Sequence, residues 1–183
     1  MSHIKERRKI LIVSESENFF QNLKSILPQS DYFPIFHAKS GGEARRKLLE
    51  LPVDILIVDS PLTDEHSVFF SQSFSDSDMG IHLVKSSAMY EQITSQVEED
   101  GIVVLPKPMN PEIFYTACRM LSAMVSKIHK MNDEKKSLQA QMQDIRLVNK
   151  AKWLLIENKK MTEADAHKFI EQAAMAQRRS RRE

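Results

Sequence analysis

Three short runs of apolar residues constrain the fold of this chain more than any other feature. They read KILIV at 9–13, DILIV at 54–58 and GIVVL at 101–105. Each run is apolar at both its odd and its even positions, so a β-strand formed there would bury both of its faces. Strands of this kind occur in parallel sheets that helices cover on both sides. The runs therefore predict an α/β fold.

The remainder of the first 110 residues supports the same fold. Two further strands are predicted at 33–37 and 80–84, and amphipathic helices at 17–27, 42–51 and 88–98. Strands that alternate with helices along a chain form a parallel sheet with helices on both faces. We therefore expect a five-stranded, doubly wound parallel sheet.

A single long helix is predicted after Asn110 and Pro111, which read as a cap and a first-turn proline. From Phe114 to Asn149 apolar residues recur at alternating spacings of three and four, as in a heptad seam, with polar interruptions at Lys135 and Asn149. The first part of this seam can pack on the sheet. For the remainder the pattern favours a parallel two-stranded coiled coil over a solvated single helix.

Length, charge and cysteine content set wider limits. The chain of 183 residues has room for one domain and a smaller module. Its 26 basic and 25 acidic residues exclude a uniformly basic nucleic-acid coat. Cys118 is the single cysteine, predicted to be a buried core residue, and no zinc site is predicted. No stretch resembles a signal peptide or membrane span, which predicts a cytoplasmic protein.

Polar residues follow three of the predicted buried strands. Glu15 follows the first strand, Asp59 the third and Lys107 the fifth. Because the carboxyl ends of parallel strands meet at one edge of a sheet, we expect these side chains to converge. An aspartate with a lysine beside it is suited to accept a phosphoryl group, since the lysine binds phosphate oxygens.

With these motifs in this order, residues 8–125 resemble a response-regulator receiver domain. The resemblance includes the step of 44 residues from Glu15 to Asp59 and the pair Lys107–Pro108. It implies that Asp59 is the phosphoacceptor, that Glu15 is a magnesium ligand and that Lys107 contacts the phosphate. It also implies a cis peptide bond between Lys107 and Pro108 and a sensor histidine kinase as a partner.

Two positions depart from the receiver pattern. Ser14 stands where receivers place the first of two acids, so the resemblance implies only a weak magnesium site. After the fourth strand, Lys85 stands where receivers place a hydroxyl residue, and Ser86 follows it. Both are predicted switch residues, and Lys85 could also lie near Asp59 and neutralise it. Conventional phosphorylation and a degenerate receiver stay open, and the departures favour the second.

The C-terminal segment carries a second set of motifs. In order they are Ala151–Lys152, Leu154–Leu155, Met161–Thr162–Glu163, Ala166–His167 and Ala174–Met175. On these motifs the segment resembles the ANTAR domain, a small three-helix RNA-binding module of bacterial antiterminators. The predicted organisation is a receiver-like domain at 8–125, a coiled-coil linker at 126–144 and an ANTAR module at 145–183. The third ANTAR helix is expected to be short or incomplete.

The charge of this segment suits an RNA-binding module. Between Arg146 and Glu183 ten Lys or Arg residues stand against five acids. Clustered basic groups attract phosphates, and loop bases can stack on aromatic or guanidinium planes. The predicted RNA contacts are Lys152, Trp153, His167, Lys168, Arg178 and Arg179. For Trp153 partly buried packing is favoured over stacking, and His167 has a surface helix position as its alternative.

The sequence thus predicts a signal-responsive, non-enzymatic, RNA-binding regulator of transcription antitermination. Its expected target is hairpins in nascent leader mRNA, and its expected assembly is a homodimer through the 114–149 helix. One alternative is a DNA-binding regulator with a C-terminal helix-turn-helix, although NKKM at 158–161 lacks the glycine common in that turn. Another is a protein-interaction receiver that binds no nucleic acid.

Overall fold

The structure of the protein is a computed structural model that describes residues 7–86 and 90–177. Its internal contacts divide the chain into two compact units, Met1–His129 and Lys130–Glu183. One long helix begins in the first unit and ends in the second. None of the described helices is both long and apolar enough to cross a membrane.

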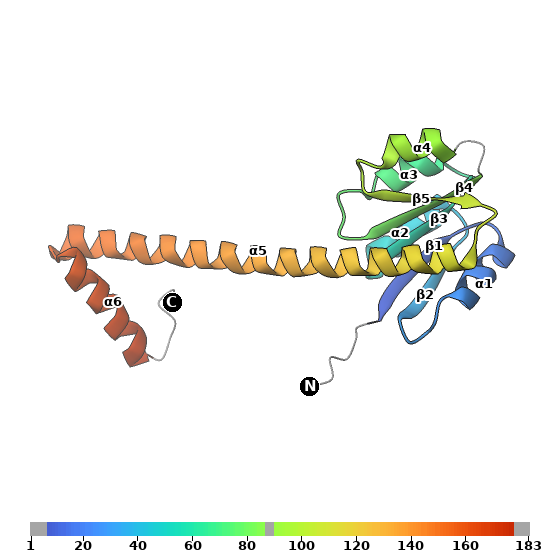
Figure 1. The fold of residues 1–183 in the computed structure, drawn as a ribbon. Helices are drawn as coiled ribbons and strands as arrows, with labels where there is room; N and C mark the ends of the chain where they lie inside the picture. The colour runs from blue at the N-terminus through green and yellow to red at the C-terminus, as the bar shows by residue number, and fades with distance from the viewer. Residues whose placement is uncertain (1–6, 87–89, 178–183) are drawn as a thin grey trace. The chain divides into compact units, whose positions relative to one another are not determined.

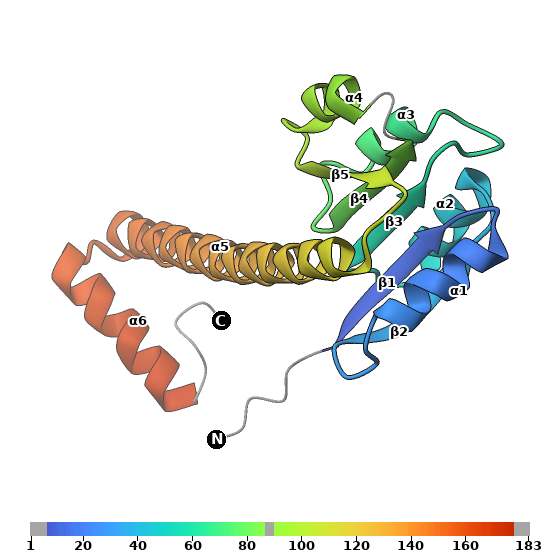
Figure 2. The ribbon, with the colours of Figure 1, turned by 45° about the vertical axis from the view of Figure 1, so that its right-hand side comes forward.

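The first unit alternates strands and helices in the predicted manner (Figure 1). Its strands are β1 (Arg8–Val13), β2 (Tyr32–Ala38), β3 (Ile55–Asp59), β4 (Gly80–Ser86) and β5 (Ile102–Lys107). Its helices are α1 (Glu17–Ile26), α2 (Gly41–Glu50), α3 (Ser67–Gln72), α4 (Tyr90–Val97) and the start of α5 (Pro111–Lys159). All strand pairs are parallel, and the order across the sheet is β2-β1-β3-β4-β5 (Figure 2). The predicted five-stranded α/β fold is confirmed.

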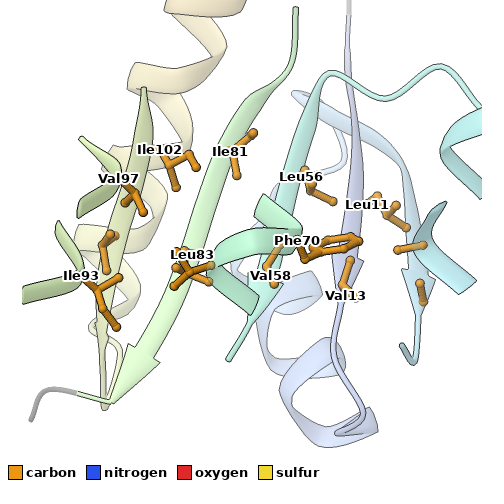
Figure 3. Close-up of a cluster of buried hydrophobic side chains, with 14 residues drawn as sticks. Leu11, Val13, Leu56, Val58, Phe70, Ile81, Leu83, Ile93, Val97 and Ile102 are labelled. Carbon is orange, nitrogen blue, oxygen red and sulfur yellow. The ribbon is translucent and has the colours of Figure 1, made fainter. Parts of the chain in front are cut away.

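Helices α2, α3 and α4 cover one face of the sheet. Alternate side chains of the central strands, such as Leu11, Val58 and Leu83, point to this face (Figure 3). They pack around Phe70 of α3, which is fully buried. Truncation of a phenylalanine in such a core to alanine costs about 3–5 kcal/mol of stability.

Helices α1 and α5 cover the other face. The intervening strand side chains, such as Ile10 and Ile12, pack there against Phe20 of α1 and Phe114 of α5. Cys118 of α5 is fully buried in the same layer, as predicted, and burial raises the pKa of its thiol to about 12. Because both faces are covered, residues 10–13 of β1 and 55–58 of β3 are apolar at consecutive positions, which explains the runs that predict these strands.

The heptad seam of α5 has two different environments. Phe114 and Leu121 are buried against the sheet, so the first part of the seam packs within the first unit. Farther along α5 the seam residues are more than half exposed in the single chain: Met131, Leu138, Met142 and Ile145. This second part has an apolar stripe that no described residue covers.

The second unit contains the end of α5 and helix α6 (Glu163–Gln177). Helix α5 ends at Lys159, and Lys160 has a φ of 56°, in the left-handed region that reverses a chain at a helix end. Thr162 then caps α6: its Oγ1 accepts a hydrogen bond from the backbone N–H of Asp165 at 3.2 Å. These residues thus end α5 at Lys159 and start α6 at Glu163.

Candidate functional site

The carboxyl edge of the sheet brings together the polar ends of three strands. Ser14 directly follows β1, Asp59 ends β3 and Lys107 ends β5. Since β1 lies between β2 and β3, the chain reverses its direction of winding between β1 and β3. In open parallel sheets, sites form at such a switch point. The predicted convergence of Asp59 and Lys107 is therefore observed.

Asp59 is held by two neighbours. The hydroxyl of Ser14 donates a hydrogen bond to Asp59 Oδ2 at 2.7 Å, and Lys107 Nζ forms an ion pair with Asp59 Oδ1. Lys107 Nζ also donates to the carbonyl oxygen of Ser60 at 3.0 Å. The Asp59 side chain is only 12% exposed, and Ser14 is fully buried. The negative charge of Asp59 is thus balanced inside the protein.

The other predicted residues of this site lie differently. Glu15 is exposed, and within the described part of the chain no hydrogen bond or ion pair joins it to Asp59. Lys85 lies opposite Pro106 in the sheet, and no ion pair of the described residues joins it to Asp59 either. The side chain of Ser86 lies outside the described residues. Lys107, not Lys85, neutralises Asp59, and the switch roles of Lys85 and Ser86 stay predictions.

Ser14 replaces an acid of the receiver pattern, and this replacement alone does not predict its hydrogen bond to Asp59. Its position after β1, next to β3, is sufficient to place a side chain against Asp59. A hydroxyl is short and can donate, so it reaches the carboxylate and forms a hydrogen bond with it. The sequence signal is therefore a small hydroxyl residue at the end of a strand adjacent to that of the acceptor.

The loop after Asp59 is fastened to the start of α2. The two carboxylate oxygens of Asp64 accept hydrogen bonds from the backbone N–H groups of Gly41 and Gly42, at 2.9 and 2.8 Å. These bonds lower the pKa of Asp64. Glu65 adds an ion pair with Arg45 at 2.8 Å. Asp64 lies 23 and 22 residues from these glycines in the sequence, so no local pattern indicates the contact.

The C-terminal unit presents some of its predicted RNA contacts and covers others. Trp153 is 70% exposed, so the packing that the sequence favours is wrong in the single chain. Lys152 Nζ instead binds Glu163 at 3.0 Å, with only 18% of its side chain exposed. His167 and Lys168 are exposed on α6. Lys152 is therefore not the freely exposed contact predicted.

Two further predicted contacts, Arg178 and Arg179, lie outside the described residues. Within α6, Ala166 is fully buried. Lys159 lies over the ring of Phe169, with its Nζ 4.9 Å from the ring centroid. These contacts hold the end of α5 and the start of α6 together. They thereby fix the backbone that carries the exposed side chains of Trp153, His167 and Lys168.

Both units are similar to parts of known proteins. Residues 136–183 match the ANTAR domain family. The transcriptional regulatory protein PdtaR of Mycobacterium tuberculosis is 24% identical over 173 residues, which are 93% of this chain and 84% of that protein. This chain thus combines a receiver-like first unit with a C-terminal segment that matches the ANTAR family.

Solved structures support the receiver fold. The signal receiver domain of an HD domain-containing protein from Pseudomonas fluorescens Pf-5 matches with a TM-score of 0.60 and 20% identity, over 67% of this chain and 99% of that one. The chemotaxis response regulator CheY4 of Vibrio cholerae matches with a TM-score of 0.53 and 22% identity, over 65% and 99%. The ANTAR match begins within α5, and the predicted boundaries at 125 and 145 stay predictions.

Receiver domains in general bind magnesium, which prefers charged oxygen ligands. In this chain the donors at the site are Asp59, the exposed Glu15 and the neutral hydroxyl of Ser14. Ser14 donates its proton to one Asp59 oxygen, and Lys107 contacts the other. This donor set fits magnesium poorly, because a hydroxyl and an ammonium group occupy both oxygens of the central carboxylate.

Proposed function

We propose that this response regulator binds hairpins in nascent leader mRNA and thereby controls transcription antitermination. The observation that carries the proposal is that Trp153 of α5 and the basic groups of α6, His167 and Lys168, are all exposed in the segment that matches the ANTAR family. We also propose that the protein is a regulator without enzymatic activity. The predicted cytoplasmic location stays a prediction.

The chemistry of the second unit supports RNA as the ligand. An indole exposed at the surface gives an unpaired loop base a plane on which to stack, worth about 1–3 kcal/mol per base. Lys168 supplies charge for phosphates, and His167 can donate a hydrogen bond. Lys152 acts indirectly here: its ion pair with Glu163 positions α6 relative to Trp153.

Fluorescence anisotropy with a labelled RNA hairpin tests this function on the full-length protein. Trp153→Ala should weaken binding about tenfold or more, because a stacked base is lost. Lys168→Gln should reduce the slope of log K against log salt by about one, because one phosphate contact is lost. Lys39→Gln, at an exposed lysine of the first unit, is the matched control and should change neither value.

A duplex DNA of the same length separates the alternatives. Preference for the hairpin at equal salt supports the proposed function, whereas preference for the duplex would favour the DNA-binding alternative. Absence of salt-dependent affinity for either would leave only the protein-interaction alternative. Equal loss of affinity in Lys39→Gln and Lys168→Gln would also contradict a contact through α6.

We propose, in addition, that the protein is a homodimer through a parallel coiled coil of α5. The exposed seam residues Met131, Leu138, Met142 and Ile145 continue the heptad spacing that Phe114 begins. Two chains would bury this stripe, and the polar seam residue Asn149 would fix their register. Two linked modules bind paired hairpins more tightly than one, because the second binding event becomes intramolecular.

Analytical ultracentrifugation tests the dimer. Leu138→Lys places a charge in the seam and should shift the protein to monomer. Gln143→Lys adds the same charge on the same helix but outside the seam, and it should stay dimeric. A wild-type monomer at concentrations of about 100 μM, well above those usual for stable coiled coils, would refute the dimer.

For the receiver, we propose control that does not require magnesium-dependent phosphorylation of Asp59. The hydrogen bond from Ser14 and the ion pair with Lys107 support this proposal, because both stabilise Asp59 without a phosphoryl group. A sensor histidine kinase would then not be an obligatory partner. The alternative is conventional phosphorylation, in which Asp59 is the acceptor.

Mass spectrometry after treatment with acetyl phosphate and magnesium decides between these alternatives. The wild-type protein should gain no phosphoryl mass, and Asp59→Asn gives the background. Ser14→Asp restores the receiver pattern of two acids and should gain magnesium affinity and phosphoryl mass. A mass gain in the wild-type protein that Asp59→Asn abolishes would establish conventional phosphorylation.

A further inference from the structure

A pocket of about 390 Å³ lies in the first unit, away from Asp59. It is formed where β1 and β2 begin, whereas Ser14 and Asp59 lie beyond the opposite, carboxyl ends of the strands. Its lining comes from two sources, the start of the strands and one face of α5: Arg8, Asp31, Tyr32, Arg119, Ser122, Ala123 and Ser126. Its volume is in the range of small-molecule sites.

The strand side of the pocket contributes a fixed guanidinium group. Arg8 pairs with Tyr32 in the sheet, and the register shifts between Arg8 and Ile10. Such an irregularity redirects a side chain. Arg8 donates a hydrogen bond to Ser126 Oγ and lies 3.6 Å from Asp54, so its guanidinium is held in place with other N–H donors remaining.

Tyr32 contributes a buried hydroxyl. It is 2% exposed, and its oxygen lies 3.4 Å from Ser122 Oγ. Ser122 has one hydroxyl proton, which makes the shorter bond to the carbonyl oxygen of Cys118 at 2.7 Å. In the 3.4 Å contact the phenol of Tyr32 is then the donor to Ser122 Oγ, and this long bond can be exchanged for one to a ligand oxygen. Burial raises the pKa of Tyr32, which keeps that proton in place.

The helix side contributes a second, exposed guanidinium group. Arg119 lies in α5 one turn before Ser122, and its guanidinium carbon is 6.0 Å from the centre of the Tyr115 ring. Among the described residues no acidic group lies within ion-pair distance of it. The pocket lining thus has two guanidinium groups and hydroxyl donors; Asp31 is its one carboxylate, and Asp54 pairs with Arg8 outside the lining.

From this arrangement we infer that the pocket binds a small metabolite through an oxyanion group, a phosphate monoester or a carboxylate. Arg8 and Arg119 bind the oxyanion from the sheet side and the helix side, because guanidinium forks match both kinds of group. The hydroxyl of Tyr32, a buried residue of the lining, donates a further hydrogen bond to the oxyanion. A bound ligand connects the strand starts to α5 and so stabilises the packing of that helix on the sheet.

Thermal unfolding and calorimetry of the full-length protein test the site, with inorganic phosphate and succinate as probes and sodium chloride as the ionic-strength control. At about ten times its Kd, a ligand should raise the Tm by about 2–5 °C. Arg119→Gln should weaken binding at least tenfold, and Tyr32→Phe should weaken it several-fold. Arg46→Gln, at an exposed arginine of α2, is the matched control and should bind normally.

The two probes separate the two oxyanions. A Tm increase with phosphate alone assigns a phosphate monoester, and one with succinate alone assigns a carboxylate. Amide exchange at 119–126 of α5 should slow when the active probe is bound. The inference is overturned if neither probe exceeds sodium chloride, or if Arg119→Gln binds like the wild-type protein. No readout uses RNA, so failure here and failure of the proposed RNA function remain distinguishable.

Discussion

His82 of β4 makes the stability of the first unit dependent on pH. Its side chain is fully buried under α5, with its ring centroid 6.2 Å from that of Phe114. Neither ring nitrogen has a hydrogen-bond partner in the described part of the chain. Burial is the main cause that lowers the pKa of His82 from its ordinary value of 6.5 to about 4, and backbone groups of Val103 and Ala117 offset part of this effect.

The direction and size of the effect follow from the two pKa values. The unfolded chain binds a proton at His82 below pH 6.5, whereas the folded chain does so only near pH 4. Between these values the unfolded state holds more protons, so the free energy of unfolding falls as the pH falls. The expected loss is about 2 kcal/mol between pH 7 and pH 5, and about 3 kcal/mol by pH 4.

Urea unfolding of the wild-type protein and His82→Leu at pH 7 and pH 5 measures this loss. All three tyrosines lie in the first unit, so their near-ultraviolet circular dichroism reports on its unfolding. His82→Leu should lose about 2 kcal/mol less than the wild-type protein, and at pH 7 it should be more stable by about 1 kcal/mol, since two unbonded nitrogens are removed. His66→Gln, at an exposed histidine, should behave as the wild type. Equal losses in the wild-type protein and His82→Leu would refute the reasoning.

Other substitutions have equally direct outcomes. Lys160→Gly should stabilise the second unit by about 0.5–1 kcal/mol, measured as the Tm from Trp153 fluorescence, because glycine has no steric cost at positive φ. Asp64→Ala should destabilise the first unit by about 1 kcal/mol in urea, because the amides of Gly41 and Gly42 lose their carboxylate. A stability unchanged within about 0.3 kcal/mol would contradict either reasoning.

The strands and long helices could be predicted from sequence because local pattern decides them. The run ILIV at 55–58 is apolar at every position, and only a strand between two helical layers buries all of it. Likewise, Thr162 followed by Asp165 marks a helix start through contacts within four residues. The apolar strand follows from a repeating pattern of residues, and the helix cap follows from a contact between residues close in sequence. Both can therefore be recognised in the sequence.

The contacts within the sites could not be predicted in the same way. Lys85 and Lys107 lie near the carboxyl ends of the neighbouring strands β4 and β5, and spacing alone allows either to reach Asp59. The structure selects Lys107 because its side chain lies at the carboxyl edge and also reaches the carbonyl oxygen of Ser60. Such a choice depends on side-chain direction and on distances across the sheet, which a linear pattern does not contain.

The seam of α5 shows the same limit and also how the two units can communicate. One spacing of three and four continues from Phe114 to Ile145, yet Phe114 is buried on the sheet and Ile145 is exposed. Periodicity indicates which face of a helix is apolar but not what covers it. Arg119 and Ser122 lie in the same continuous helix as the exposed stripe. A change in the packing of α5 at these two residues can therefore change how the stripe is presented to a second chain. If both proposals hold, a ligand in the pocket should therefore change the dimerisation constant of the wild-type protein, and Arg119→Gln should abolish that change while still forming dimers.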